Sequence, residues 1–177
     1  MQETADQSSE EQQSAEAGTL SGNYLLKDVA PEVVAGLEEI CIWSRVPEGT
    51  QIFDRDDTHT DVFFVIEGSV RVLDHAESGQ EVAFSDINAG EVFGELSAID
   101  HKERSATVYA LEECFLARAP GKEFTDFLLR YPEMAVQMMG HFVQTIRDLN
   151  SRVVGLSSMT SIQRVYAEIL QMSEPDP

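Results

Sequence analysis

The middle of the chain, from about Thr50 to Ala119, consists of short apolar runs separated by turn residues. In DVFFVIEGSVRVL, two such runs, 62–66 and 70–73, flank Glu67-Gly68-Ser69, a spacing that predicts a β-hairpin. Further runs of the same kind are QIF, EVAF, ATVYAL and CFLARA. Several short strands at such spacing are typical of a β-sandwich, a jelly roll or a barrel. The pattern therefore predicts a mainly β domain.

Helical patterns lie on both sides of the predicted strands. Apolar residues recur at helical spacing in NYLLKDVAPEVVAGLEEICIW, where Pro31 suits the first turn of a helix. After Pro120, the segment GKEFTDFLLRYP has one apolar side, and Pro132 opens a long helix. We therefore expect one amphipathic helix or two short ones before the β domain, and two more helices after it.

The long helix has the most regular apolar pattern in the chain. Its apolar residues are separated by 4, 3, 4, 3, 4 and 3 positions, which is the spacing of a coiled-coil seam. A helix packed on its own β domain is the alternative, and a wider apolar stripe would favour it. Because the remaining positions are mostly polar or small, we favour a parallel homodimer. Following Ala135, the residues of the predicted dimer seam are Met139, Phe142, Ile146, Leu149, Val153 and Leu156.

Charge and composition exclude several classes of protein. Twelve Lys and Arg residues against 32 Asp and Glu residues leave the 177-residue chain with a formal net charge of -20. Because Lys and Arg supply much of the affinity for DNA phosphates, we expect this chain by itself to bind DNA poorly. Residues 1–22 have almost no large apolar side chains, which predicts a disordered acidic leader. No run approaches the roughly 20 apolar residues of a membrane span, and no secretory signal is present, so we expect a cytoplasmic protein without a membrane partner.

Catalytic and metal-binding patterns are not evident in the sequence. Cys41 and Cys114 are too few and too far apart for a zinc or redox motif. The four histidines are scattered along the chain: His59, His75, His101 and His141. No nucleophile is grouped with a base and an orienting residue. We therefore expect no enzyme, no catalytic residue, no metal and no cofactor.

One segment between the strands, residues 90–108, combines features of a phosphate site. Gly94 allows the backbone to approach a ligand closely, and a helical turn from about Glu95 would direct free N–H groups at an anion. Arg104 could return to the same place and add a charge-assisted contact. The alternative is that Arg104 forms a solvent-screened ion pair with a nearby glutamate. On residues alone, both interpretations stay open.

The order of these residues resembles a known family. The run Phe93-Gly94-Glu95-Leu96, followed by Arg104-Ser105-Ala106-Thr107-Val108, resembles the phosphate-binding cassette of cyclic nucleotide-binding domains. From Tyr131 onward the chain is similar to the dimerisation helix and hinge of the catabolite activator protein and fumarate-nitrate regulator (Crp/Fnr) superfamily of transcription regulators. The resemblance implies a jelly-roll (double-stranded β-helix) domain over residues 23–131 and a dimerisation helix over 132–158. It also implies a hinge and the first helix of an otherwise absent winged helix-turn-helix over 159–177.

The resemblance also implies a ligand, cAMP or cGMP, and residues that hold it. Arg104 matches the arginine that pairs with the cyclic phosphate, and Glu95 matches the glutamate that accepts a hydrogen bond from the ribose 2′-hydroxyl. Backbone N–H groups and the Ser105 hydroxyl or N–H would complete the phosphate site; the residues that supply those N–H groups are Gly94, Leu96 and Ser97. Leu149 and Asn150 occupy the places of the two polar residues that contact the base. Leu149 departs from that pattern.

The function that follows from the resemblance is regulatory. Ligand binding would shift the dimer helix and an attached DNA-reading module, so DNA would be a partner only through a domain absent from this chain. The alternative is a stand-alone or degenerate cyclic nucleotide-binding module that regulates a protein partner without DNA binding. In the degenerate case, Glu95 and Arg104 would pair with each other.

Overall fold

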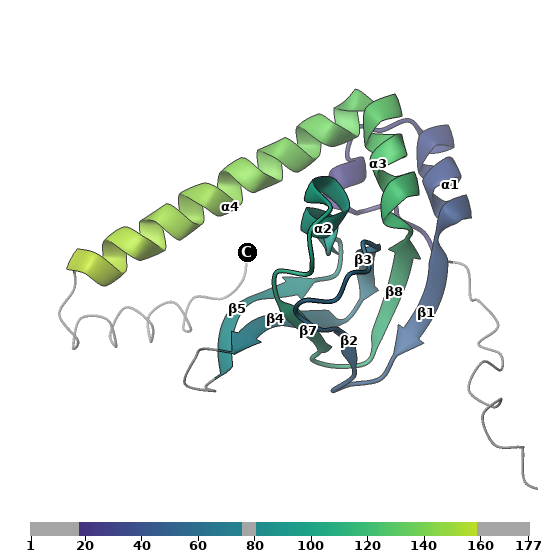
Figure 1. The fold of residues 1–177 in the computed structure, drawn as a ribbon. Helices are drawn as coiled ribbons and strands as arrows, with labels where there is room; N and C mark the ends of the chain where they lie inside the picture. Colours follow the sequence, from purple (N-terminus) through teal and green to yellow (C-terminus); the bar gives the residue numbers. More distant parts are fainter. Residues whose placement is uncertain (1–17, 76–80, 159–177) are drawn as a thin grey trace, which may run out of the picture. The chain divides into compact units, whose positions relative to one another are not determined.

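The fold is seen in a computed structural model that describes residues 18–75 and 81–158 (Figure 1). Two compact units make up the chain, Met1–Gln137 and Met138–Pro177. The helices are η1, a 3-10 helix (Tyr24–Leu26), α1 (Pro31–Ile40), α2 (Glu95–Asp100), α3 (Gly121–Arg130) and α4 (Pro132–Ser158). The strands are β1 (Ile42–Val46), β2 (Gln51–Phe53), β3 (Val62–Glu67), β4 (Ser69–His75), β5 (Glu81–Asn88), β6 (Val92–Phe93), β7 (Thr107–Ala110) and β8 (Cys114–Ala119).

Eight strands in the described part of the chain form two four-stranded sheets. One sheet has the order β1-β8-β3-β6 and the other β2-β7-β4-β5, and the paired strands run antiparallel. Apart from β4 and β5, neighbours in each sheet are not consecutive in the sequence, which is typical of a jelly roll. The predicted class is confirmed: a mainly β domain with flanking helices and a long C-terminal helix.

The hairpin predicted around Glu67-Gly68-Ser69 is wrong, although both of its strands exist. β3 pairs with β6 and β8, whereas β4 pairs with β5 and β7 in the other sheet. Gly68 has φ +83°, and a Cβ there would lie 2.7 Å from the Glu113 carbonyl oxygen. This tight, left-handed corner carries the chain from one sheet to the other instead of folding it back.

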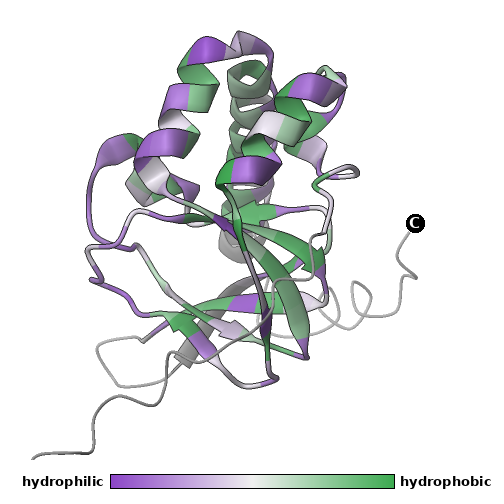
Figure 2. Cartoon of the chain, turned by 90° about the vertical axis from the view of Figure 1, so that its right-hand side faces the viewer, coloured by the Kyte–Doolittle hydropathy of each residue, from purple (hydrophilic) through white to green (hydrophobic). Residues whose placement is uncertain are grey.

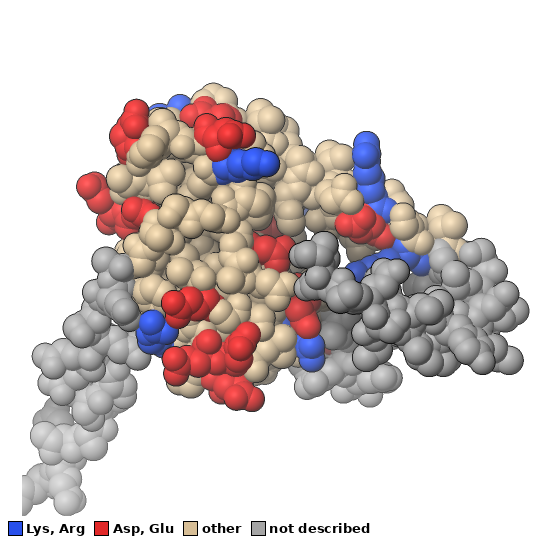
Figure 3. Space-filling view, turned by 180° about the vertical axis from the view of Figure 1, so that it is seen from behind, with Lys and Arg blue, Asp and Glu red and all other residues tan. Residues whose placement is uncertain are grey.

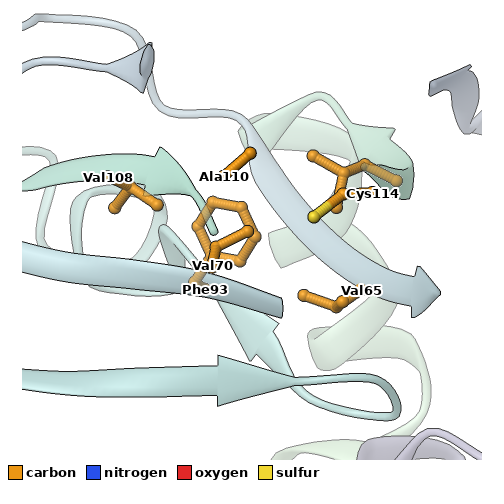
Figure 4. Close-up of a cluster of buried hydrophobic side chains, with 7 residues drawn as sticks. Val65, Val70, Phe93, Val108, Ala110 and Cys114 are labelled. Carbon is orange, nitrogen blue, oxygen red and sulfur yellow. The ribbon is translucent and has the colours of Figure 1, made fainter. Parts of the chain in front are cut away.

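The core lies between the two sheets (Figure 4). Val65, Phe93 and Cys114 come from the first sheet, and Val70 and Val108 come from the second. All five side chains are buried. Complete burial of a large apolar side chain contributes about 1.5–3 kcal/mol, so this interdigitation holds the sheets together.

The shorter helices of the first unit pack against its sheets and one another. Phe124 of α3 is fully buried and meets Phe64 of β3 edge-on, with ring centroids 6.0 Å apart. Pro31 opens α1 as predicted, but that helix ends at Ile40, and Trp43 belongs to β1 rather than to a helix. Figure 2 shows hydrophobic residues along the strands and mixed hydropathy along the helices.

Residues 18–22 were assigned to the leader from the sequence, but they are built into the first unit. Leu20 is 1% exposed, and its N–H donates to Glu38 Oε1 at 2.8 Å. A buried leucine and a side-chain acceptor hold this stretch. The average composition of residues 1–22 does not reveal these two contacts. The rest of the predicted leader, residues 1–17, and the predicted hinge and first helix at 159–177 lie outside the described residues.

Within residues 18–75 and 81–158, no helix combines the length and apolarity needed to cross a bilayer. The longest, α4, spans the range 132–158 predicted for the dimerisation helix.

Candidate functional site

A left-handed glycine starts the site. Gly94 follows β6, adopts φ 81° and ψ 3°, and is the N-cap of α2. A Cβ at this position would lie 2.7 Å from Arg104 Nη1 and 2.9 Å from the Asp61 carbonyl oxygen. Only glycine therefore allows both this backbone turn and the close approach of the Arg104 guanidinium.

The Arg104 guanidinium is buried, with 3% of the residue exposed. Its Nη1 donates to the Gly94 carbonyl oxygen at 2.8 Å and to Ser97 Oγ at 2.7 Å. Its Nη2 donates to the Asp61 carbonyl oxygen at 2.7 Å. All three acceptors are uncharged, so these hydrogen bonds hold the cation in place without neutralising it.

The Nε of Arg104 is buried and has no hydrogen-bond partner among the described residues. Leaving a buried donor unpaired costs about 1–3 kcal/mol. A buried cation with an unpaired N–H is therefore suited to receive an anionic acceptor, because an anion would satisfy both the charge and the donor.

An aromatic cluster supports the guanidinium. The Arg104 Cζ lies 4.1 Å from the centroid of the Phe53 ring and 6.0 Å from that of Phe63. Phe63 in turn stacks on Phe93, with centroids 5.0 Å apart and planes inclined by 11°. Stacking on a ring face is favourable for a planar cation and fixes the plane of the guanidinium.

The backbone of Arg104 is anchored by the loop after β2. The Arg104 N–H donates to the Asp57 carbonyl oxygen at 2.9 Å, and the Asp56 N–H donates to the Arg104 carbonyl oxygen at 3.2 Å. Within the loop, Asp57 Oδ2 accepts from the Asp54 N–H at 2.9 Å, and Asp54 Oδ1 accepts from Thr107 Oγ1 at 2.6 Å. Both ends of the arginine are therefore fixed before any ligand arrives.

Burial governs the protonation of the two charged site residues. It lowers the pKa of Arg104, while the charges of Asp61, Asp57 and Glu95 oppose this shift. Burial raises the pKa of Glu95, opposed by its own backbone N–H and by the Arg104 charge.

The surface is acidic: Figure 3 shows more red than blue side chains on one face of the molecule. An anionic ligand must therefore be attracted by hydrogen-bond donors in the site rather than by the electrostatic field of the whole protein.

Three of the predicted cassette residues meet directly, since Arg104 hydrogen-bonds both Gly94 and Ser97. Glu95 opens α2 and is partly buried, and the hydrogen bonds of the Arg104 side chain to described residues go to Gly94, Ser97 and Asp61 rather than to Glu95. Leu96 is 49% exposed, and Ser105 is exposed beside Arg104. Their ligand contacts stay predictions.

The predicted base-contact and seam residues lie on α4 in the second unit. Leu149 is 54% exposed, Asn150 is also exposed, and the roles of both in base recognition stay predictions. The seam residues with exposed side chains are Met139, Ile146, Leu149 and Val153. Phe142 is partly buried, and the side chain of Leu156 lies outside those described. Val136, Val143 and Val154 are exposed as well, so the apolar stripe is wider than the predicted seam, and the homodimer stays a prediction.

Sequence reasoning missed Phe53 and Asp61. Their contacts to Arg104 cross 51 and 43 positions of the chain and depend on the sheet topology. Neither residue stands in a local motif, so only the fold could find them. Within the described part of the chain, no group of three or more His, Cys, Asp or Glu residues is placed to hold a metal ion.

Comparison with known proteins agrees with this geometry. The sequence model of the cyclic nucleotide-binding domain matches residues 43–131, which is half of the chain. The cyclic AMP receptor protein of Thermus thermophilus is 27% identical over 153 residues, covering 86% of this chain and 71% of that protein. The lysophospholipase NTE1 of Mycosarcoma maydis is 26% identical over 152 residues, covering 86% of this chain.

A solved structure gives the same result for the fold. The catabolite activator protein of Thermus thermophilus superposes with a TM-score of 0.69 at 27% identity, covering 76% of this chain and 63% of that one. The chain spans only 7% of the lysophospholipase, so that match concerns one domain of a much longer protein. The matched range contains β2 to β8, the Gly94 turn and Arg104, and the chain belongs to the family of cyclic nucleotide-binding domains.

Proposed function

We propose that this chain binds cAMP or cGMP and forms the sensing part of a bacterial Crp/Fnr-type transcription regulator. The observation that carries the proposal is the Arg104 guanidinium, which is buried, held by uncharged acceptors and left with an unpaired Nε. The names of relatives add the ligand class: the Thermus thermophilus protein is a cyclic AMP receptor. A relative from Salmonella typhimurium is named a cAMP-activated global transcriptional regulator.

Each proposed contact matches a chemical need of a cyclic nucleotide. The cyclic phosphate carries one negative charge, and Arg104 would supply the cation and the free N–H. Hydrogen bonds to charged groups contribute about 1.5–3 kcal/mol each, so one such contact is a large share of micromolar binding. The backbone N–H groups of Leu96 and Ser97 and the Ser105 hydroxyl would surround the remaining phosphate oxygens.

Glu95 would bind the sugar. A carboxylate accepts strongly from the ribose 2′-hydroxyl and so distinguishes ribose from deoxyribose. Burial raises its pKa in spite of a hydrogen bond from its own backbone N–H, and a ribose hydroxyl would supply a further donor. Selection of adenine or guanine would involve Asn150, whose amide carries both a donor and an acceptor.

The output would pass through α4. Exposed apolar residues along this helix support a homodimer, because a second copy would cover them. A ligand that binds one helix arrangement more tightly shifts the population toward it and reorients an attached DNA-reading domain. The chain, at a net charge of -20, would contact DNA only through such a domain.

A regulatory module for a protein partner is the second candidate. It is favoured by the match to 7% of a lysophospholipase, since that match covers one domain of a long protein that carries a different name. In both cases the chain is a binding module and not itself an enzyme.

Calorimetric titration with cAMP, cGMP and 5′-AMP tests the proposal. We expect micromolar or tighter binding of at least one cyclic nucleotide and much weaker binding of 5′-AMP, whose open, more highly charged phosphate does not fit a cassette shaped for the ring. Absence of binding heat with both cyclic nucleotides at several temperatures would contradict the proposal. Arg104→Gln, which keeps a polar but shorter and uncharged side chain, should abolish the binding.

A further inference from the structure

Asp61 contacts Arg104 with its main chain while its side chain binds another arginine. The Asp61 carbonyl oxygen accepts from Arg104 Nη2 at 2.7 Å. Its carboxylate oxygen Oδ2 accepts from Arg118 Nη1, also at 2.7 Å. Asp61 therefore lies between two guanidinium groups. Its carboxylate pairs with Arg118, whereas Arg104 contacts only its carbonyl oxygen.

The sheet fixes this arrangement. Asp61 immediately precedes β3, and β3 pairs with β8 so that Phe63 lies opposite Arg118 and Val62 opposite Ala119. Arg118 thus projects from the strand next to the one that Asp61 leads into. Its side chain is 42% exposed, and that of Asp61 is 23% exposed. An ion pair at this exposure contributes little to stability, so its main effect is on where the carboxylate points.

The direction of that carboxylate affects the anion site. Asp61, Asp57 and Glu95 are the acidic residues whose charges act on Arg104. None of their carboxylates is hydrogen-bonded to the guanidinium among the described contacts, and Asp57 Oδ2 is taken by the Asp54 N–H. Of the three, Asp61 already touches the guanidinium through its carbonyl oxygen. If its carboxylate turned inward, it could occupy the N–H groups that a phosphate needs.

We propose that Arg118 is a positioning residue for the ligand: by holding the Asp61 carboxylate outward, it keeps the Arg104 guanidinium free of an internal anion. An incoming phosphate then pairs with Arg104 without first displacing a carboxylate of the protein. This inference rests on the cyclic nucleotide binding proposed above and adds a residue that does not itself touch the ligand.

The test compares cyclic nucleotide affinities by calorimetry in four variants. Arg118→Gln releases the Asp61 carboxylate and should weaken the binding of cAMP or cGMP about fivefold, the effect of one competing ion pair. Asp61→Asn removes the competitor and should bind at least as tightly as the wild type. The double variant Asp61→Asn/Arg118→Gln should regain wild-type affinity. A merely structural role for Arg118 would not be rescued in this way.

Arg71→Gln is the matched control. Arg71 binds Asp86 across β4 and β5, its side chain is also 42% exposed, and its loss changes the net charge equally. This variant should bind like the wild type. Thermal unfolding of all variants checks that each is folded.

The outcomes separate the two proposals. If the wild type binds and Arg118→Gln binds equally well, or if the double variant stays as weak as Arg118→Gln, the positioning role is wrong while the proposed function stands. If Arg71→Gln weakens binding as much as Arg118→Gln, the effect is one of net charge and the inference fails. If the wild type binds neither cyclic nucleotide, both proposals fall.

Discussion

The guanidinium carbon of Arg104 lies 4.1 Å from the centroid of the Phe53 ring. Phe53 ends β2, and the following loop holds the backbone of Arg104 through Asp56 and Asp57. One short segment therefore supports both the side chain and the main chain of the proposed anion-binding residue. The site is preorganised, which reduces the conformational entropy that ligand binding must overcome.

Replacing Phe53, the aromatic ring under Arg104, should weaken ligand binding. Phe53→Leu keeps an apolar side chain but removes the ring face under the guanidinium. We expect cyclic nucleotide affinity to fall about two- to tenfold, the range of a partly desolvated cation–π contact. Phe53→Tyr keeps the ring and should retain the affinity. Equal affinities of the leucine variant and the wild type in calorimetry would show that the ring does not orient Arg104.

A methyl group at Gly94 should displace the arginine. Gly94→Ala places a Cβ 2.7 Å from Arg104 Nη1 at a residue with φ +81°. We expect a loss of stability of about 1–2 kcal/mol from the left-handed backbone and at least a tenfold loss of affinity, on the order of 1.4 kcal/mol. Urea unfolding and ligand titration measure the two effects separately.

Gly49→Ala is the control for this variant. Gly49 has φ +75° but no atom within 4 Å of its Cβ position. It carries the same backbone penalty without the contact, so it should lose stability and keep its affinity. If both variants lose affinity alike, the close approach at Gly94 is not what the site requires.

Glu95 should make the stability of the ligand-free protein depend on pH. Its pKa is raised in the folded state by burial. The charged form is therefore disfavoured in the folded protein, and the free energy of unfolding should fall as pH rises from the unfolded pKa, about 4.3, through the higher folded pKa. Glu95→Gln lacks this carboxylate, so the variant should be more stable than the wild type at neutral pH and equally stable at acidic pH.

The same substitution should weaken ligand binding. The neutral amide of Glu95→Gln accepts more weakly from a ribose hydroxyl, so affinity should fall while the unliganded protein becomes more stable. Thermal unfolding between acidic and neutral pH, with and without cyclic nucleotide, measures both. Lower stability of the variant at neutral pH would contradict a net cost of burying the Glu95 carboxylate.

The apolar face of α4 should control oligomeric state. Ile146 is 56% exposed in the single chain and lies in the predicted seam. Ile146→Asp places a charge there, and sedimentation should show a monomer where the wild type is a dimer. Ser151→Asp adds the same charge at an exposed position outside the seam and should leave the dimer intact. A dimeric Ile146→Asp variant would exclude this face as the interface.

The parts of this fold that were predictable are those with local signals. The strands β7 and β8 coincide with the runs ATVYAL and CFLARA, and α4 begins at Pro132 as the sequence indicates. The meeting of Gly94 with Arg104 follows from a motif ten positions long. Each of these depends on neighbours in sequence, which a pattern records.

What could not be predicted depends on topology. The Gly68 turn looks like a hairpin in sequence, yet its two strands join different sheets, because pairing is decided by the distant strands β5 to β8. Phe53 and Asp61 reach Arg104 for the same reason. Leu20 stands among small and polar residues, so the sequence did not indicate that it is buried and that its N–H donates to Glu38.

The state of Arg104 Nε before and after ligand addition tests the central claim most directly. In the ligand-free protein this N–H is buried without an acceptor among the described residues. NMR of the arginine Nε–Hε groups, with the Arg104 signal assigned by its loss in Arg104→Lys, follows it during titration with cAMP or cGMP. We predict a large downfield proton shift and slower exchange with water as the phosphate accepts from Nε–H. Saturating ligand with an unchanged Arg104 signal would contradict the account.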